Sequence, residues 1–265
     1  MVTSKTNTPP GIRNKKMHGW RLPSYEKIIL ITICIFWVIV VWLLGLGKIF
    51  LDGLVNYAIH FTNWSWTING VYLLLDLVSC LDKTGKLSFY VISIGFWLVN
   101  GVSWIVFTLI FIVLHDNPDL LINMSDRGSG EQTLGFIMDM DRVFHVLPAL
   151  VILLYMFMRR DKIGLVVYVF MNKRENQYAL RFNYAFISMI SPVLFTIIYC
   201  ITVDIYAIYG ITTRLLYIVL IGFVTLVVCN IVPFIVFVRK YAYSKHSHER
   251  FGSYADMIVY GHENV

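Results

Sequence analysis

The segment "HFTNWSWTING", residues 60–70, places several hydroxyl and amide side chains at the start of an apolar run. Thr62, Ser65 and Asn69 follow the i, i+3, i+7 spacing and therefore share one face of a helix. A threonine hydroxyl in this setting can attack an ester when a neighbouring base removes its proton. Asn63, Ser65 and Asn69 can then donate hydrogen bonds to the oxyanion that the attack creates. The alternative is that this polar face only packs against neighbouring helices.

His145 is the candidate base, because it lies about one turn inside another apolar run, residues 142–158. Both runs are expected to enter the membrane from the same side, so Thr62 and His145 should lie at similar depth. A proton transfer between them then requires that the two helices are neighbours, which the sequence does not establish. The alternative for His145 is a hydrogen bond that joins two helices without any chemistry.

The composition indicates that most of the chain lies in lipid. Of its 265 residues, 58% are hydrophobic and 14% are charged, whereas soluble domains carry about 25% charged residues. Six apolar runs are long enough to cross a hydrocarbon core of ~30 Å as helices, and they cover residues 28–47, 60–80, 89–114, 142–158, 183–209 and 215–238. We therefore predict an all-α integral membrane protein, with a bundle of six transmembrane helices at residues 28–238.

The distribution of Lys and Arg predicts the orientation of this bundle. Of the 22 basic residues, 18 fall in segments that alternate to one side, namely residues 1–27, 81–88, 159–182 and 239–265. The positive-inside rule therefore places both termini in the cytoplasm. We expect residues 1–27 to form a basic N-terminal segment there and residues 239–265 to form a C-terminal tail. The opposite side holds an acidic outer loop at residues 115–141, in which Asn123 begins a glycosylation sequon. We expect a protein of an endomembrane or of the plasma membrane.

Three features are not explained by the six spans themselves. Asp76 lies near the cytoplasmic end of its span and is expected to reach the headgroups near Lys83 and Lys86, the alternative being a buried partner or a relay position. Asp204 lies near the outer end of its span and is expected to reach water. The run "LVVYVFM", residues 165–171, is too short to cross, so it should lie at the surface or prolong the fourth helix.

The run "FTNWSWTINGVYLLLDL" resembles the second-span motif of the androgen-induced protein and Rolling stone group of six-pass membrane proteins. The fourth run is similar as well, since His145 is followed by Val146, Leu147 and Pro148. The androgen-induced branch consists of threonine-dependent membrane hydrolases that act on fatty acid esters of hydroxy fatty acids, whereas the Rolling stone branch is linked to cell fusion. The resemblance implies that Thr62 is the nucleophile and that His145 is its partner.

The position of the histidine differs from that in the family hydrolases, where it lies five residues before the proline. His145 lies three residues before Pro148, and two residues correspond to ~200° around a helix. The difference predicts a His145 ring that points away from Thr62 unless a local insertion compensates. The ungapped equivalent is Val143, which has no chemistry.

Three classes of function follow. The first is a hydrolase of fatty acyl esters that takes a lipid ester from the bilayer, and the second is a non-enzymatic structural, adhesion or fusion-related membrane protein. The third is a small transporter or receptor, but no span shows the paired Gly or Pro interruptions that carriers have. No motif predicts a cofactor or a metal site, and the four cysteines are expected to be packing residues. Nucleic-acid binding is not expected either, because the basic residues lie between the apolar runs rather than in one patch.

Overall fold

The computed structural model describes residues 24–37, 60–82, 85–116, 131–172, 177–203 and 215–243, together with isolated positions between 39 and 58. For residues 24, 26, 109–116, 131–144, 177–180, 182 and 215–219, the description is limited to the backbone. Asn123 and Asp204, for which the sequence predicts glycosylation and contact with water, lie outside the described residues.

Every element of secondary structure within the described residues is helical. The α-helices are α1 (Ser24–Trp37), α3 (Phe61–Ser79), α4 (Lys86–Asp116), α6 (Glu131–Met158), α7 (Arg160–Asn172), α8 (Gln177–Thr202), α10 (Leu215–Leu226) and α11 (Val232–Phe237). Two π-helical turns, η3 (Val227–Ile231) and η4 (Val238–Ala242), follow α10 and α11, so residues 215–242 form one continuous helical path. The predicted all-α fold class is therefore confirmed for this part of the chain.

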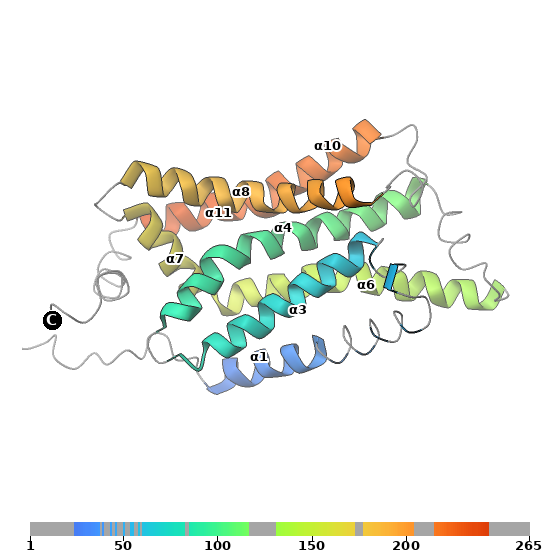
Figure 1. Cartoon of the computed structure of the whole chain (residues 1–265), viewed down its shortest axis with the longest axis horizontal. Coiled ribbons are helices and arrows are strands. Elements are labelled where there is room, and N and C mark those ends of the chain that lie inside the picture. The colour runs from blue at the N-terminus through green and yellow to red at the C-terminus, as the bar shows by residue number, and fades with distance from the viewer. Residues whose placement is uncertain are drawn as a thin grey trace, which may run out of the picture.

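Helix α4 lies at the centre of the bundle (Figure 1). It contacts α3, α6, α7, α8 and α10, whereas α1 packs against α3 at the edge. The long helices lie roughly along one axis, and α3, α4, α6, α8 and α10 alternate in direction. As a result α3 and α6 run in the same direction, and α4 runs the opposite way against both of them.

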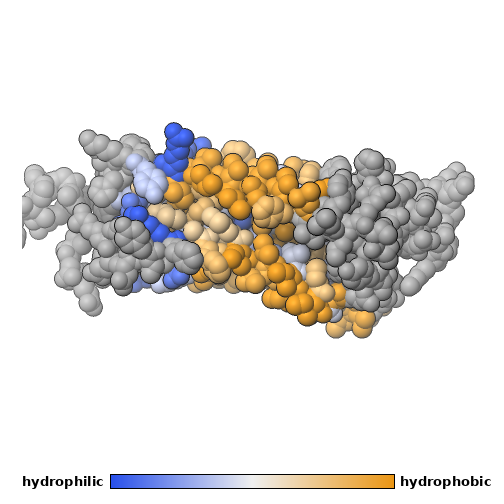
Figure 2. Space-filling model, turned by 90° about the horizontal axis from the view of Figure 1, so that it is seen from above, coloured by the Kyte–Doolittle hydropathy of each residue, from blue (hydrophilic) through white to orange (hydrophobic). Residues whose placement is uncertain are grey.

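Apolar side chains cover the outside of the bundle, while polar side chains lie within it. On α3 the buried polar residues include Ser65, Asn69 and Asp76. Apart from Thr67, the exposed residues of the same helix are apolar, namely Val71, Leu74, Leu75 and Val78. Figure 2 shows the resulting apolar band across the middle of the molecule, with hydrophilic residues gathered at one end. A surface of this kind is stable in lipid, where no water solvates polar groups, and is unfavourable in water.

Among the described residues, three helical segments are long and apolar enough to cross a membrane: Lys86–Thr108, Asn183–Thr202 and Leu220–Ala242. Two shorter segments, Lys27–Trp37 and His145–Met158, are also apolar. The chain is therefore a multi-helix membrane protein, and a crossing by α1, α3 and α6 stays a prediction. Helix α3 is not among the three apolar segments, since one of its faces is polar and buried.

Of the two expectations for residues 165–171, the surface position is wrong, and instead of prolonging the fourth helix the chain begins a separate helix after a break at Arg159. These residues belong to α7, in which every side chain from Lys162 to Val169 is buried. Helix α7 packs against α4, α8 and η4, and an added Cβ at Gly164 would come within 2.6 Å of the Tyr241 ring. A short helix that is apolar nearly all round is stable when neighbouring helices enclose it.

The fourth helix begins earlier than the sequence predicts. Helix α6 starts at Glu131 rather than near Arg142, so the last part of the segment expected as an acidic loop, residues 131–141, is helical. Hydropathy places a boundary where the apolar run begins, but a helix can continue through polar residues beyond it.

Two proline breaks are satisfied by asparagine side chains from neighbouring helices. A proline has no N–H to donate to the carbonyl four residues before it. For Pro192 this carbonyl belongs to Ser188, and it accepts a hydrogen bond from Asn230 Nδ2 at 3.0 Å. For Pro233 it belongs to Cys229, and it accepts from Asn100 Nδ2 at 2.8 Å. Because Asn100 Nδ2 also donates to Asn230 Oδ1 at 2.8 Å, one network joins α4, η3 and α8.

Candidate functional site

Three of the hydrogen-bonded pairs that join α3 to α6 and to Arg159, the residue directly after α6, have the same separation along the chain. The partners lie 83 positions apart in each case: Thr62 with His145, Tyr72 with Tyr155, and Asp76 with Arg159. A constant separation requires that the two helices run parallel and keep one register along their contact. The neighbouring helices that a Thr62–His145 contact needs are therefore present.

The partners on α3 belong to a row of polar side chains with alternating spacings of three and four residues. The row consists of Thr62, Ser65, Asn69, Tyr72, Asp76 and Ser79, and all of these except Thr62 are buried. Such spacing keeps one stripe of a helix against a parallel partner, as in coiled coils. This row and its partners, namely His145 and Tyr155 on α6 and Arg159 directly after that helix, are called the α3–α6 seam below.

Thr62 and His145 are in direct contact near the start of α3. Thr62 Oγ1 lies 2.7 Å from His145 Nε2, in a half-buried position. When Thr62 donates this hydrogen bond, Nε2 accepts it and the neutral imidazole carries its proton on Nδ1. The shorter spacing to Pro148 therefore does not turn the ring away from Thr62, contrary to the expectation from the family pattern.

Thr62 is the second residue of α3, where the helix backbone favours negative charge. The chain enters the helix at His60 in an extended conformation, and the Asn63 N–H donates to the His60 carbonyl at 3.0 Å. The first N–H groups of a helix have no acceptors within it, and the helix dipole is positive at this end. A negative charge that develops near Thr62 Oγ1 is therefore stabilised by the backbone.

Two of the candidate oxyanion donors are engaged elsewhere. Asn69 Nδ2 donates to the Ser65 carbonyl at 2.8 Å and to Ser103 Oγ of α4 at 3.0 Å. Ser65 and Asn69 are both fully buried, so this part of the polar face joins α3 to α4. Asn63, the third candidate donor, is half-buried and follows Thr62 directly in the sequence.

Two aromatic residues of α3, one before and one after Thr62 in the sequence, pack against aromatic side chains of α8. The Phe61 ring contacts the rings of Phe195 and Tyr199, with centroids 6.0 Å and 4.8 Å away. Trp64 packs edge-on against the same two rings. Phe61 and Tyr199 are almost fully buried, so the residues on either side of Thr62 in α3 lie in apolar surroundings that limit the approach of water.

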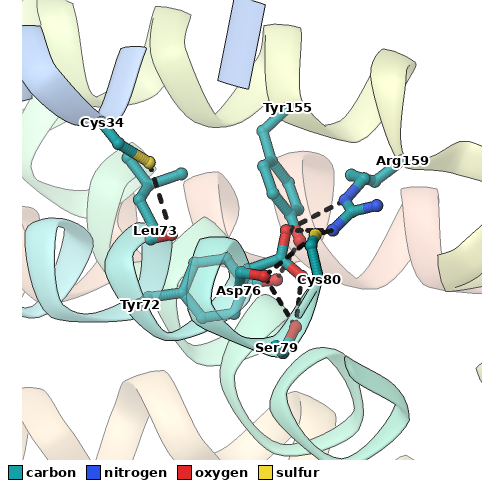
Figure 3. Close-up of polar contacts among 8 residues, drawn as sticks. All are labelled: Cys34, Tyr72, Leu73, Asp76, Ser79, Cys80, Tyr155 and Arg159. Atoms are coloured by element: carbon teal, nitrogen blue, oxygen red, sulfur yellow. Dashed lines mark hydrogen bonds and ion pairs between the residues drawn. The ribbon is translucent and has the colours of Figure 1, made fainter. Parts of the chain in front are cut away.

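A buried ion pair forms the other end of the α3–α6 seam (Figure 3). Arg159 Nε and Nη2 donate to Asp76 Oδ2 at 2.9 Å and 2.6 Å, and the exposed fractions of the two residues are 1% and 0%. Arg159 Nη2 also reaches Cys80 Sγ at 3.2 Å, and Ser79 Oγ lies 3.3 Å from Asp76 Oδ1. The expectation that Asp76 reaches the headgroups is therefore wrong, because Arg159, directly after α6, supplies a cation at the same level of the bundle.

Sequence reasoning did not identify Arg159, although a signal exists. Asp76 follows Thr62 by 14 residues, and Arg159 follows His145 by the same 14 residues. Two parallel helices that pair at one of these positions must also pair at the other, since 14 residues are two heptads. The matched spacing could have been found once Thr62 and His145 were considered partners.

The described residues hold no group of three or more side chains suited to a metal ion. Cys34 is buried, and its thiol donates to the Leu73 carbonyl at 3.4 Å. Cys80 and Cys229 are partly buried, but Cys200 is exposed, so the expectation of a buried packing role is wrong for Cys200. An exposed thiol on an apolar helix face is compatible with contact to lipid.

The fold and the inverted distribution of polar and apolar side chains define a multi-helix membrane protein. Comparisons with protein-family models, with curated protein sequences and with solved structures each find no match to this chain.

Proposed function

We propose that this protein is a six-span membrane hydrolase of fatty acyl esters and that it belongs to the androgen-induced protein and Rolling stone group. The observation that carries the proposal is the hydrogen bond of 2.7 Å between Thr62 Oγ1 and His145 Nε2. A hydroxyl held against an imidazole is the arrangement from which nucleophilic catalysis begins. The first turn of α3 adds backbone donors for negative charge.

The reaction proceeds in two halves. His145 Nε2 takes the proton of Thr62 Oγ1 while that oxygen attacks the acyl carbonyl of the substrate. The tetrahedral intermediate collapses, and the leaving alkoxide takes the proton from His145 as the alcohol departs. A water molecule then attacks the acyl-threonine, with His145 accepting its proton and returning it to Thr62 Oγ1. The products are an alcohol and a fatty acid.

A lipid substrate fits the surroundings of the pair. Exposed apolar side chains cover the lipid-facing side of α3, among them Val71, Leu74 and Leu75. An acyl chain can follow this face from the bilayer towards the start of the helix without crossing a charged surface. Thr62 is half-buried rather than enclosed, so a carbonyl at the end of such a path can reach it.

The six-span arrangement is supported by the parallel course of α3 and α6. Two parallel helices joined through one antiparallel helix, α4, enter the bundle from the same side. Together with the excess of Lys and Arg in residues 81–88 and 159–182, this supports a topology with both termini in the cytoplasm and Thr62 towards the opposite leaflet.

The test is ester hydrolysis by purified protein in detergent or in vesicles. Thr62→Ala and His145→Ala should each lower kcat/KM by at least ~100-fold, since each removes one partner of the proton transfer. Thr67→Ala is the matched control, because Thr67 is exposed on the same helix and its hydroxyl bonds the Asn63 carbonyl of its own turn. Full activity of Thr62→Ala or of His145→Ala would overturn the proposal.

A second candidate function is a non-enzymatic structural or adhesive role. It is favoured by the seam itself, because Tyr72–Tyr155 and Asp76–Arg159 join the same two helices in the same register without chemistry of this kind. In that case Thr62–His145 is a third structural contact. Ester hydrolysis by the native protein and by Thr62→Ser distinguishes the two candidates. A hydrolase should still turn over in Thr62→Ser, because serine keeps a nucleophilic hydroxyl. A purely structural pair gives no turnover in the native protein or in the variant.

A further inference from the structure

We propose that Asp76 and Arg159 are positioning residues that set the register of α3 against α6 and so bring His145 to Thr62. The catalytic consequence rests on the proposed function, but the register itself can be measured without any activity. The ion pair lies 14 residues, or ~21 Å of helix, from the Thr62–His145 contact.

The contacts along the seam show why a register must be selected. Between the Thr62–His145 contact and the ion pair, the hydroxyls of Tyr72 and Tyr155 form a hydrogen bond of 2.8 Å. Apolar helix faces pack in several staggers at similar energy, whereas a single polar pair in a helix seam is known to select one register.

The ion pair penalises a shifted arrangement. Sliding α6 by one heptad would place Asp76 opposite Ile152, a fully buried aliphatic residue. Asp76 and Arg159 are themselves buried at 0% and 1% exposure, so a slip would leave both charges without a partner inside the bundle. The same slip would carry His145 two helical turns away from Thr62.

The hydrogen bonds of Arg159 are suited to fixing the position of α6 relative to α3. Its Nε and Nη2 both bond Asp76 Oδ2, so the guanidinium is oriented as well as held at one level. Ser79 Oγ donates to the Asp76 carbonyl at 2.7 Å and lies near Oδ1 of the same residue, which ties the carboxylate to the last turn of α3. Arg159 itself lies at the break between α6 and α7, so its position also fixes where α6 ends.

The experiment measures the register by cross-linking. The four native cysteines are replaced by serine, Thr62→Cys and His145→Cys are introduced, and a bifunctional thiol reagent too short to span two helical turns is applied in membranes. The native ion pair should give efficient cross-linking. Asp76→Leu combined with Arg159→Met keeps the volume without leaving a buried charge, so this variant should fold, but its cross-linking should fall by about fivefold or more because the register is no longer unique.

The charge-reversed pair, Asp76→Arg with Arg159→Asp, should restore at least half of the native cross-linking. Tyr72→Phe with Tyr155→Phe is the matched control, since it removes a neutral contact of the same seam and should leave cross-linking near the native level. Native cross-linking in the apolar pair would overturn the inference, as would a folded charge-reversed variant that does not cross-link. A loss as large in the tyrosine control would also contradict it.

The catalytic readout uses the same ion-pair variants with Thr62 and His145 intact. In the apolar pair, kcat should fall by ~100-fold while KM changes little, because a misplaced base slows the chemical step and not the binding of the acyl chain. Recovery of kcat in the charge-reversed variant is the result that a loss of stability alone would not give. If the native protein hydrolyses no ester, the proposed function fails, whereas the cross-linking result still decides the register.

Discussion

Asn230 Nδ2 donates a hydrogen bond to the Ser188 carbonyl at 3.0 Å, and this carbonyl is the one that Pro192 leaves without its helical donor. Asn230 lies in the π-helical turn η3, fully inside the bundle. The side chain thus replaces a backbone hydrogen bond of another helix. In lipid no water is present to donate a hydrogen bond to an unsatisfied carbonyl, so the bond from Asn230 contributes to the stability of α8.

The first prediction is that the contribution of Asn230 to the free energy of unfolding depends on Pro192. Asn230→Ala should lower the free energy of unfolding by ~1–3 kcal/mol, because it leaves the Ser188 carbonyl buried and unsatisfied. Pro192→Ala returns an N–H to that carbonyl, so the cost of Asn230→Ala should be clearly smaller in the Pro192→Ala background. Unfolding in denaturing detergent measures the four variants of the cycle.

Asn183→Ala is the control for this cycle, because Asn183 is an exposed asparagine on α8, the helix that contains Pro192. Its effect should be small in both backgrounds. Strict additivity of Asn230→Ala and Pro192→Ala would show that the hydrogen bond from Asn230 does not substitute for the missing backbone bond.

The second prediction compares two glycines in neighbouring helices. A Cβ added at Gly101 would come within 2.6 Å of the Pro192 ring, whereas a Cβ at Gly222 would meet no atom within 4 Å. Gly101→Ala should therefore force α4 and α8 apart and cost ~1–3 kcal/mol. Gly222→Ala should be neutral or stabilising by up to ~1 kcal/mol, since alanine is the better helix former. Thermal unfolding in detergent distinguishes them, and equal effects would contradict the close approach of α4 to Pro192.

The sequence predicts the depth of Thr62 and His145 well, because depth follows from where each apolar run begins and from the direction of the chain. It also predicts the common face of Thr62, Ser65 and Asn69, since helical spacing is a local property. Which helices are neighbours is not local. For this reason the sequence alone could not predict that Thr62 contacts His145. It also led to the expectation that Asp76 reaches the lipid headgroups, whereas Asp76 pairs with Arg159.

The position of α7 was missed for a different reason. A short apolar run such as residues 165–171 has the same pattern whether it lies on a membrane surface or inside a bundle. Only the space left between α4, α8 and η4, which accommodates α7 through the close contact of Gly164 with Tyr241, decides between the two. The wrong family-based expectation for the His145 ring has a similar origin, since distance to a proline along one helix does not fix how that helix is rotated against its partner.

The third prediction concerns topology. Lys86 at the start of α4 and Arg160 at the start of α7 are exposed and follow the ends of the parallel helices α3 and α6. In a serine-for-cysteine background, Lys86→Cys and Arg160→Cys should react with an impermeant maleimide from the same side of sealed vesicles. Thr202→Cys, at the far end of α8, should react from the opposite side. Labelling of Lys86→Cys and Arg160→Cys from different sides would rule out the six-span arrangement.

The fourth prediction follows from the acyl-threonine intermediate. With an activated short-chain ester the leaving group departs readily, so formation of the intermediate outpaces its hydrolysis and an acyl group accumulates on one residue. Mass spectrometry of acid-quenched protein should find that acyl group on Thr62. Thr67→Ala should accumulate it at the native level, whereas His145→Ala should accumulate at least ~100-fold more slowly, because the hydroxyl then has no base within hydrogen-bond distance. An acyl group on another side chain would assign the nucleophile elsewhere. Ester turnover without acylated protein, in a variant that hydrolyses the ester slowly, would do the same. In both cases the Thr62–His145 hydrogen bond is a contact between helices.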